Sequence, residues 1–253
     1  MIFIFFFIFG LCVGSFLNVL IYRLPRGLGF VKGRSFCPKC KKQIRWYDNI
    51  PLLSFVLLGG RCRVCHSPIS LRYPLVELIS GLVTVLIFKN FFTYAVDFLS
   101  LLSLICYLFL AWGLVVIFFI DAERQIIPDE ITFPLTILFF IFRVFFSPPL
   151  FIFSAVGSFL FLLIIFMVTG GKGMGFGDVK LAFLIGLALG FPKVVVAFYL
   201  AFLTGAIFGI ILILVKKKSL KQKIAFGPFL AAATLISLLW GERIINFYQK
   251  ILV

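Results

Sequence analysis

The feature that most constrains the fold of this chain is the regular recurrence of long apolar blocks. Blocks of about 17 to 25 residues, the length that a helix needs to cross the hydrocarbon of a bilayer, follow one another along the sequence. Hydrophobic residues make up 63% of the chain, which leaves too little polar surface to cover a water-soluble globule. The sequence therefore predicts an all-α integral membrane protein, a polytopic helical bundle.

We expect about eight transmembrane helices. The sixth is short, and we interpret it as a short crossing rather than a re-entrant helix, because otherwise the lysine-rich run 216–223 would lie outside. The predicted spans are Met1–Leu24, Tyr73–Phe88, Val96–Ile120, Ile131–Phe146, Leu150–Thr169, Val179–Phe191, Val194–Val215 and Ile224–Trp240.

Basic residues predict the orientation of these spans. The longest polar region, Arg23–Arg72, carries eleven lysines and arginines against one acid, Asp48, so the positive-inside rule makes it cytoplasmic. Basic residues of membrane proteins mark such loops and contact anionic lipids, so the net charge of +15 does not indicate nucleic acid. We divide the chain into a first transmembrane helix (1–24), a small cytoplasmic insert (25–72) and a transmembrane core (73–253).

Four cysteines in the insert predict a metal site. They form two Cys-x-x-Cys pairs, Cys37 with Cys40 and Cys62 with Cys65, with 21 residues between the pairs. This spacing is typical of a structural zinc site with four thiolates, and a cytoplasmic location disfavours the alternative of two disulfides. A redox pair is disfavoured because there are two pairs and no βαβ pattern. His66 is a possible substitute ligand, although four cysteines already complete the coordination.

Acidic residues are scarce, nine in all, and two of them, Asp121 and Asp178, attract attention. Asp121 closes the uncharged run Phe98–Ile120, and Asp178 precedes the sixth span. Under the predicted topology both ends are cytoplasmic, so two carboxylates from distant parts of the sequence reach the same membrane level. Each has an ordinary alternative: Asp178 suits a helix N-cap, and Asp121 can end a span at the headgroups.

Glycines surround Asp178 in the stretch GMGFGDVK. Gly173, Gly175 and Gly177 lack a Cβ atom, so the backbone can bend sharply and approach another chain, such as a peptide substrate. Two nearby carboxyl groups can share one proton; the ionised group then removes a proton from water while the protonated group polarises a scissile carbonyl. Peptide hydrolysis by Asp121 and Asp178 is therefore the functional alternative to two helix caps.

Five segments of the chain form a recognisable set: GSFLNVLIYRLP at 14–25, YDNIPLLSFVLLGGRCRVC at 47–65, ISLRYPLVELISG at 69–81, DAERQIIPDEIT at 121–132 and GMGFGDVKL at 173–181. Together they resemble the type IV prepilin peptidases, bacterial inner-membrane aspartic peptidases of the Gly-x-Gly-Asp type. They follow one another in the family's order from the first span to the sixth.

The resemblance implies that Asp121 and Asp178 are the catalytic pair. The lack of Cβ atoms makes Gly175 and Gly177 our candidates for the substrate loop. Residues 73–253 would then be the transmembrane peptidase core. The implied substrate is a prepilin or a type II secretion pseudopilin, whose basic leader is cut at the cytoplasmic face. Many members then methylate the new N-terminus with S-adenosylmethionine, and members with the cysteine module are typically bifunctional.

The site of the methyl donor is less defined by the sequence. The chain lacks a Gly-x-Gly-x-x-Gly element after a strand, so a Rossmann-type site is not expected. Glu77 is our candidate, because an acid inside a membrane helix is costly unless it is paired or functional. An ion pair with Arg72 is the competing explanation.

Three other functions stay open at this point. An ion-coupled transporter would need acids near the middle of the bilayer and internal repeats, and we identify neither. A receptor or assembly scaffold would use the zinc module to bind partners, with both aspartates acting as caps. A peptidase without methyltransferase activity is the third.

Overall fold

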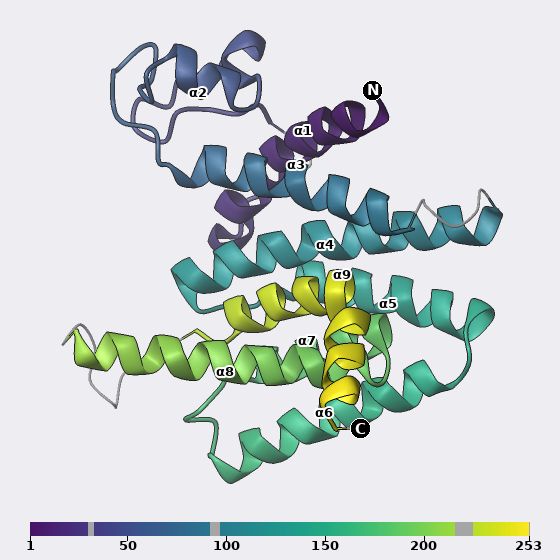
Figure 1. The fold of residues 1–253 in the computed structure, drawn as a ribbon. Helices are drawn as coiled ribbons and strands as arrows, with labels where there is room; N and C mark the ends of the chain where they lie inside the picture. The colour runs from purple at the N-terminus through teal and green to yellow at the C-terminus, as the bar shows by residue number, and fades with distance from the viewer. Residues whose placement is uncertain (30–32, 92–96, 216–224, 253) are drawn as a thin grey trace. The chain divides into compact units, whose positions relative to one another are not determined.

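Helices make up the regular structure of this protein. The computed structural model describes residues 1–29, 33–91, 97–215 and 225–252, and within them it contains no β-strand (Figure 1). The predicted all-α fold class is confirmed. The α-helices are α1 (Ile2–Arg23), α2 (Leu53–Leu57), α3 (Arg72–Phe91), α4 (Phe98–Arg124), α5 (Asp129–Phe146), α6 (Leu150–Val168), α7 (Phe176–Leu189), α8 (Lys193–Leu214) and α9 (Gly227–Leu252).

Six helices in the described ranges are long and apolar enough to cross a membrane: α1, α3, α4, α6, α8 and α9. The other two long helices, α5 and α7, do not qualify. Helix α7 has only 14 residues, and α5 carries three charged residues, Asp129, Glu130 and Arg143. The protein is therefore a multi-pass membrane protein, while the number of about eight crossings stays a prediction.

Several predicted boundaries differ from the observed helices. Helix α7 begins at Phe176 rather than Val179, and α9 continues to Leu252, well beyond the predicted end at Trp240. The prediction stopped at Trp240 because charged residues follow, but a helix can continue past the membrane. The predicted starts at Val96 and Ile224 and the lysine-rich run 216–223 lie outside the described residues.

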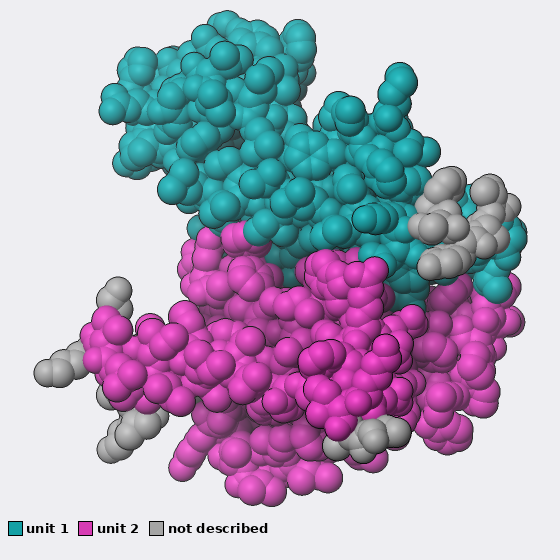
Figure 2. All heavy atoms as spheres, viewed as in Figure 1, with its two compact units in different colours: residues 1–116 teal, residues 117–253 magenta. Residues whose placement is uncertain are grey.

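The chain divides into two compact units, residues 1–116 and residues 117–253, which Figure 2 shows in different colours. The division falls within α4, so the first part of this helix belongs to one unit and its last two turns to the other. The predicted division into 1–24, 25–72 and 73–253 describes membrane and loop segments and stays a prediction.

In the first unit, α1 packs closely against α3. A Cβ atom on Gly10 would lie 2.8 Å from the Cα atom of Gly81, and one on Gly14 would lie 2.7 Å from the Cα atom of Glu77. Two small residues four positions apart thus let the two backbones approach, as is common between helices in membranes. The indole N–H of Trp112 in α4 donates to the Thr84 hydroxyl at 3.0 Å, which ties α4 to α3.

In the second unit, α7 is surrounded by other helices. It contacts α5, α6, α8 and α9, and most of its side chains are buried. Its carboxyl end is satisfied by Arg143 of α5, whose guanidinium donates to the backbone oxygens of Leu187 and Ala188 at 2.9 and 2.6 Å. Because protein surrounds α7 and caps its end, this helix does not need the length of a lipid-exposed span.

Candidate active site

Asp121 lies in the last turn of α4 and is almost completely buried, with 5% of its surface exposed. The helix ends just beyond it: the Gln125 backbone N–H donates to the Asp121 backbone oxygen at 2.8 Å, and Gln125 has a positive φ of 57°. The chain then turns towards α5. The carboxylate of Asp121 is thus held at the end of a rigid helix, as the sequence predicts.

Asp178 is the third residue of α7 and is also 5% exposed. Gly175 is the N-cap, so the expectation of Asp178 itself as a possible N-cap is wrong by three positions. One carboxylate oxygen, Oδ2, accepts the Gly175 backbone N–H at 2.9 Å, which is the reciprocal half of a capping box. The other oxygen, Oδ1, is buried and has no hydrogen-bond partner among the described residues. Capping therefore uses only half of this carboxylate.

The two aspartates line one cavity of about 320 Å³ in the second unit. They are near enough for their charges to interact. The rest of the wall comes from the turn after α4, the loop 171–177 and residues 225 and 226 before α9. Arg124 and Lys172 add positive charge to this wall. The structure thus brings together the two carboxylates that the sequence singled out, although they belong to different helices.

The glycines of the loop differ in what surrounds them. A Cβ atom on Gly177 would lie 3.0 Å from the Cβ of Ile127, whereas one on Gly175 would meet nothing closer than Asp178 Oδ2, at 3.6 Å. The positive φ values in this loop belong to Gly170 and Gly171, at 57° and 70°. The sharp bend expected around Asp178 is therefore made at the end of α6, and Gly175 leaves open space beside the carboxylate.

Sequence reasoning missed one contributor, Gly227 at the start of α9. A Cβ atom on this residue would lie 2.6 Å from Asp121 Oδ2, closer than side chains tolerate, and its backbone N–H donates to that carboxylate. Each aspartate therefore lies at the amino end of a helix, Asp178 at α7 and Asp121 at α9, where helix dipoles favour negative charge. The Gly227-Pro228 pair before an apolar run was the available signal, but it was interpreted as part of the eighth span.

An ion pair connects the helices beside the cavity. Lys180 of α7 donates to both carboxylate oxygens of Asp129 in α5, at 2.9 and 2.8 Å. Asp129 is the first residue of α5, which follows the turn after Asp121. This contact links the segment that carries Asp121 to the helix that carries Asp178.

In the first unit, the four cysteines of the insert form a cluster. The sulfur atoms of Cys37, Cys40, Cys62 and Cys65 all lie within 4.8 Å of one another. The Cys37 and Cys65 sulfurs are 3.8 Å apart, which matches the edge of about 3.8 Å expected for a tetrahedron with zinc–sulfur bonds of about 2.3 Å. The donor set and its spacing fit a four-coordinate thiophilic metal.

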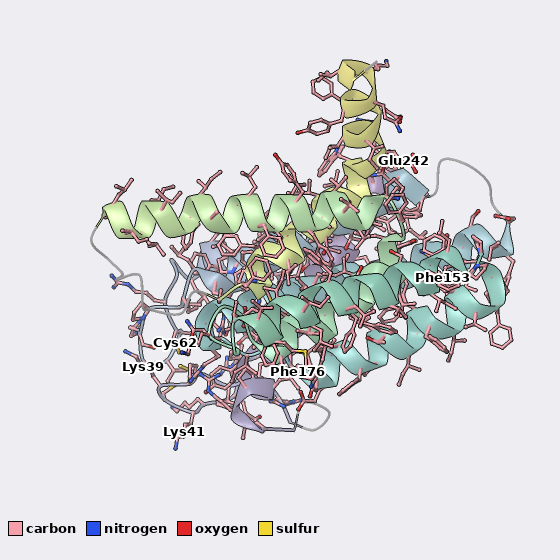
Figure 3. The ribbon with its side chains drawn as sticks, turned by 90° about the horizontal axis from the view of Figure 1, so that it is seen from below. Lys39, Lys41, Cys62, Phe153, Phe176 and Glu242 are labelled. Atoms are coloured by element: carbon pink, nitrogen blue, oxygen red, sulfur yellow. The ribbon has the colours of Figure 1, made fainter. Side chains whose placement is uncertain are left out.

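The two cysteine pairs have the same local structure, which decides the position of His66. Each first cysteine accepts a backbone N–H four residues on, from Lys41 in one pair and from His66 in the other. Lys41 and His66 both have a positive φ, 58° and 54°, and both side chains are exposed. Lys41 points outward from the module (Figure 3). His66 therefore occupies the turn position that Lys41 occupies in the other pair, outside the sulfur cluster.

Hydrogen bonds prepare one cysteine for metal binding. The Ser67 hydroxyl, 3.1 Å from the Cys65 sulfur, and the Ser67 backbone N–H lower the pKa of Cys65 to about 6. A thiol with this pKa is largely ionised at neutral pH, and the thiolate is the form that binds metals.

Comparisons with known proteins agree with this arrangement. Residues 108–210 match the model of the type IV leader peptidase family, and residues 8–91 match the bacterial peptidase A24 N-terminal domain. The chain belongs to the type IV leader peptidase family. The family match contains Asp121 and Asp178 and ends before Gly227, while the N-terminal match contains the four cysteines and Glu77.

Curated relatives are similar over nearly the whole chain. Proteins named prepilin leader peptidase/N-methyltransferase from Aeromonas hydrophila and Pseudomonas aeruginosa are both 37% identical to it. The alignments cover 96% and 95% of this chain and 92% and 91% of the relatives. The protein of that name from Neisseria gonorrhoeae is 34% identical over 89% of this chain and 86% of its own length. No solved structure matches the chain.

In this type IV leader peptidase, Glu77 belongs to the first unit, whereas the residues that line the aspartate cavity belong to the second. It is 9% exposed, on the first turns of α3. Its Oε2 accepts the backbone N–H of Leu52 at 2.8 Å, and Ser15 of α1 also hydrogen-bonds to it. Glu77 lines a second cavity, of about 400 Å³.

Proposed function

We propose that Asp121 and Asp178 are the catalytic pair of a membrane aspartic endopeptidase. The enzyme removes the basic leader from type IV prepilins or type II secretion pseudopilins and then methylates the new N-terminus. The observation that carries the assignment is a shared cavity lined by two buried carboxylates from different helices, in which one oxygen of Asp178 has no partner among the described residues.

The chemistry follows from two neighbouring carboxyl groups that share one proton. The ionised carboxylate takes a proton from water, the water oxygen bonds to the scissile carbonyl carbon, and the protonated carboxyl group donates to the carbonyl oxygen. The carbon–nitrogen bond then breaks as the amine receives a proton from the pair. Gly175 and Gly227 fix one carboxylate each through backbone N–H groups, so both acids are oriented before substrate binds.

We further propose that the substrate backbone approaches Asp178 beside Gly175, where a Cβ atom would meet nothing closer than the carboxylate itself. Gly177 has a different role in this proposal: because it has no side chain, the side chain of Ile127 fits beside it. These two residues form the substrate loop of the proposal.

The four cysteines hold a structural zinc ion in this proposal. Four thiolates leave no open position for water, so the metal supplies folding free energy to the small insert rather than catalysis. The methyl group comes from S-adenosylmethionine, which supplies an electrophilic carbon when it is bound.

We place the enzyme in the bacterial inner membrane, with the zinc module and the aspartate cavity at the cytoplasmic side. The support is the excess of basic residues in the insert, by the positive-inside rule. Its partners are the prepilin or pseudopilin substrate and anionic lipids around the basic loops, and nucleic acid is not among them. The first transmembrane helix (1–24), the zinc module (25–72) and the peptidase core (73–253) are the functional parts of the proposal.

The test uses purified full-length enzyme in detergent with a prepilin, and follows leader loss and methyl incorporation separately. Asp121→Asn and Asp178→Asn should each abolish leader loss. Glu242→Gln is the matched control, since this acid is 77% exposed and pairs with Lys193 on the surface. Full leader loss in either aspartate variant would contradict the assignment of that aspartate to the catalytic pair. Leader loss without methylation in the wild type would indicate a peptidase alone.

A further inference from the structure

The last turns of α9, residues 241–252, leave the helix bundle of the second unit, and the peptidase chemistry does not use them. Helix α9 begins at Gly227 beside Asp121 and packs along α8. Near Glu242 it changes direction and extends away from α8, as Figures 1 and 3 show. At 1.5 Å per residue this stretch is about 18 Å long. We call it the end segment of α9.

Contacts with Lys193 place the beginning of the end segment at a membrane surface. Lys193 is the first residue of α8, a helix that is long and apolar enough to cross a membrane. Its Nζ lies 2.8 Å from Oε1 of Glu242, and its backbone oxygen accepts the Ser237 hydroxyl at 2.7 Å. Helix α7 leads from Asp178 at the cavity to the turn before α8, so Lys193 lies at the opposite end of the unit. The end segment therefore leaves the bundle at the surface opposite the aspartate cavity.

The two faces of the end segment differ in polarity. Its apolar side chains recur at helical spacing, and the chain leaves this face open: Phe247, Tyr248 and Ile251 are 62%, 50% and 64% exposed. A helix with one apolar and one charged face lies in the plane of the membrane interface, with its apolar face among the acyl chains. The apolar residues are Ile244, Ile245, Phe247, Tyr248 and Ile251, and the polar residues are Glu242, Arg243, Asn246, Gln249 and Lys250.

Charge indicates that lipid covers this segment. Arg243 and Lys250 are exposed and lie seven positions apart, two helical turns along the same edge of the polar face. The one acid in the sequence of the segment, Glu242, pairs with Lys193. The polar face therefore presents positive charge, which complements the headgroups of anionic lipids. The ring of Tyr248 is of the kind enriched at membrane surfaces.

A second copy of the chain fits this face less well. The exposed parts of the few apolar side chains amount to a few hundred Å², whereas a specific protein interface buries more than about 1,000 Å² in total. Insertion into lipid needs no such minimum, because each buried apolar group contributes separately.

We propose that the end segment of α9 is an amphipathic anchor that lies in the lipid interface opposite the aspartate cavity. Its apolar face, with Phe247 and Ile251, contacts the acyl chains. Arg243 and Lys250 contact the headgroups of anionic lipids. The ion pair between Lys193 and Glu242 holds the start of the anchor at this level of the membrane.

The experiment measures thiol accessibility in the full-length enzyme, reconstituted into vesicles of phosphatidylcholine and phosphatidylglycerol. Phe247→Cys and Gln249→Cys form a matched pair, because both positions are exposed in the protein but lie on opposite faces of the helix. A membrane-impermeant maleimide should react at least about tenfold faster at position 249 than at 247, since the apolar face is buried in lipid. Mass spectrometry separates these thiols from the native cysteines, and the rates in denatured protein correct for intrinsic reactivity.

Two results of this measurement would overturn the anchor. Equal corrected rates at 247 and 249 would show that the segment extends into water. Protection at 247 that is lost when the protein is diluted with lipid would assign the face to a second copy of the chain.

Lipid composition tests the two basic residues. One basic residue near an anionic surface contributes about fivefold to membrane association. The thiol introduced at 247 should therefore react several-fold faster in vesicles of phosphatidylcholine alone, and Arg243→Gln combined with Lys250→Gln should remove this difference. Equal rates in the two kinds of vesicle, without these substitutions, would overturn the assignment of Arg243 and Lys250 to anionic headgroups.

A measurement on the unmodified enzyme keeps the proposal testable if a variant does not fold. Tyr47 of the insert is 36% exposed, less than Tyr248. In vesicles, hydroxyl radicals should nevertheless oxidise Tyr248 more slowly than Tyr47, because lipid covers only the former. Faster oxidation of Tyr248 than of Tyr47, as their exposure in the protein alone predicts, would overturn the proposal.

Discussion

The cysteine cluster and the aspartate cavity differ in the sequence separation of the residues that form them. Each half of the cysteine site is one closed turn, and 21 residues separate the two halves. Asp121 and Asp178 are 57 positions apart, and Gly227 follows after another 49. The first site depends on short-range turns that a metal can join, whereas the second exists only when α4, α7 and α9 are packed together. The two regions should therefore respond differently to substitution.

Metal removal should have the largest effect, and this effect should be confined to the cysteine region. Chelation or Cys62→Ser removes a contribution that reaches about 10 kcal/mol or more in small zinc modules, so the insert should unfold. Limited proteolysis should then cut within residues 25–72, and zinc content should fall to zero. Leader cleavage should fall far less than the protease resistance of the insert, because the aspartate cavity is lined by residues from 121 onwards.

Cys106→Ser is the control for Cys62→Ser, because this buried cysteine lies in α4, outside the cluster. Wild-type protease resistance of residues 25–72 in metal-free protein would show that the insert folds without the metal and would remove the contrast between the regions.

Loss of either carboxylate should have the next largest effect, in the opposite region. Positioned acid–base groups contribute about 10²- to 10⁴-fold, so Asp178→Asn should lower kcat for leader cleavage by about three orders of magnitude. Asparagine can still accept the Gly175 N–H, so the thermal midpoint should hardly change. A large drop in the midpoint together with unchanged kcat would instead assign Asp178 to capping alone.

Gly227→Ala tests whether the distant helix start positions Asp121. The new Cβ would lie 2.6 Å from Asp121 Oδ2, so the carboxylate must shift, and a shift of about 1 Å in a catalytic group costs about 100-fold in rate. We expect kcat to fall by about that factor and KM to change little. Gly157→Ala is the control, because a Cβ atom there meets nothing within 4 Å. Equal kcat values for the two variants would exclude this positioning function.

The Asp129–Lys180 pair should have the smallest effect. Its side chains are 47% and 28% exposed, and ion pairs of this kind contribute about 0.2 to 1 kcal/mol. Lys180→Met should therefore change the thermal midpoint slightly, with cleavage within a few-fold of the wild type. A double-mutant cycle with Asp129→Asn measures the coupling directly, and a value well above 1 kcal/mol would show that this contact, rather than helix packing, holds the cavity together.

The sequence predicted the local features well and the contacts between helices poorly. The apolar blocks gave the helices and their order, and the cysteine spacing gave the cluster, because both signals lie in adjacent residues. The predicted start of α7 was wrong because it relied on the hydrophobic pattern. The hydrogen bond from the Gly175 backbone N–H to the Asp178 carboxylate, which marks the true start, leaves no signal in that pattern. The short length of α7 is explained only by Arg143, which caps it from another helix.

By itself the sequence determined that this chain is a multi-pass membrane protein, which residues form its cysteine cluster and which two acids are worth attention. Only the tertiary structure decided that both acids line one cavity, that Asp178 keeps one oxygen without a partner and that Gly227 borders Asp121. The physical reason is that composition and spacing control hydrophobic burial and local turns. The position of a side chain opposite another helix depends instead on close packing of residues remote in the chain.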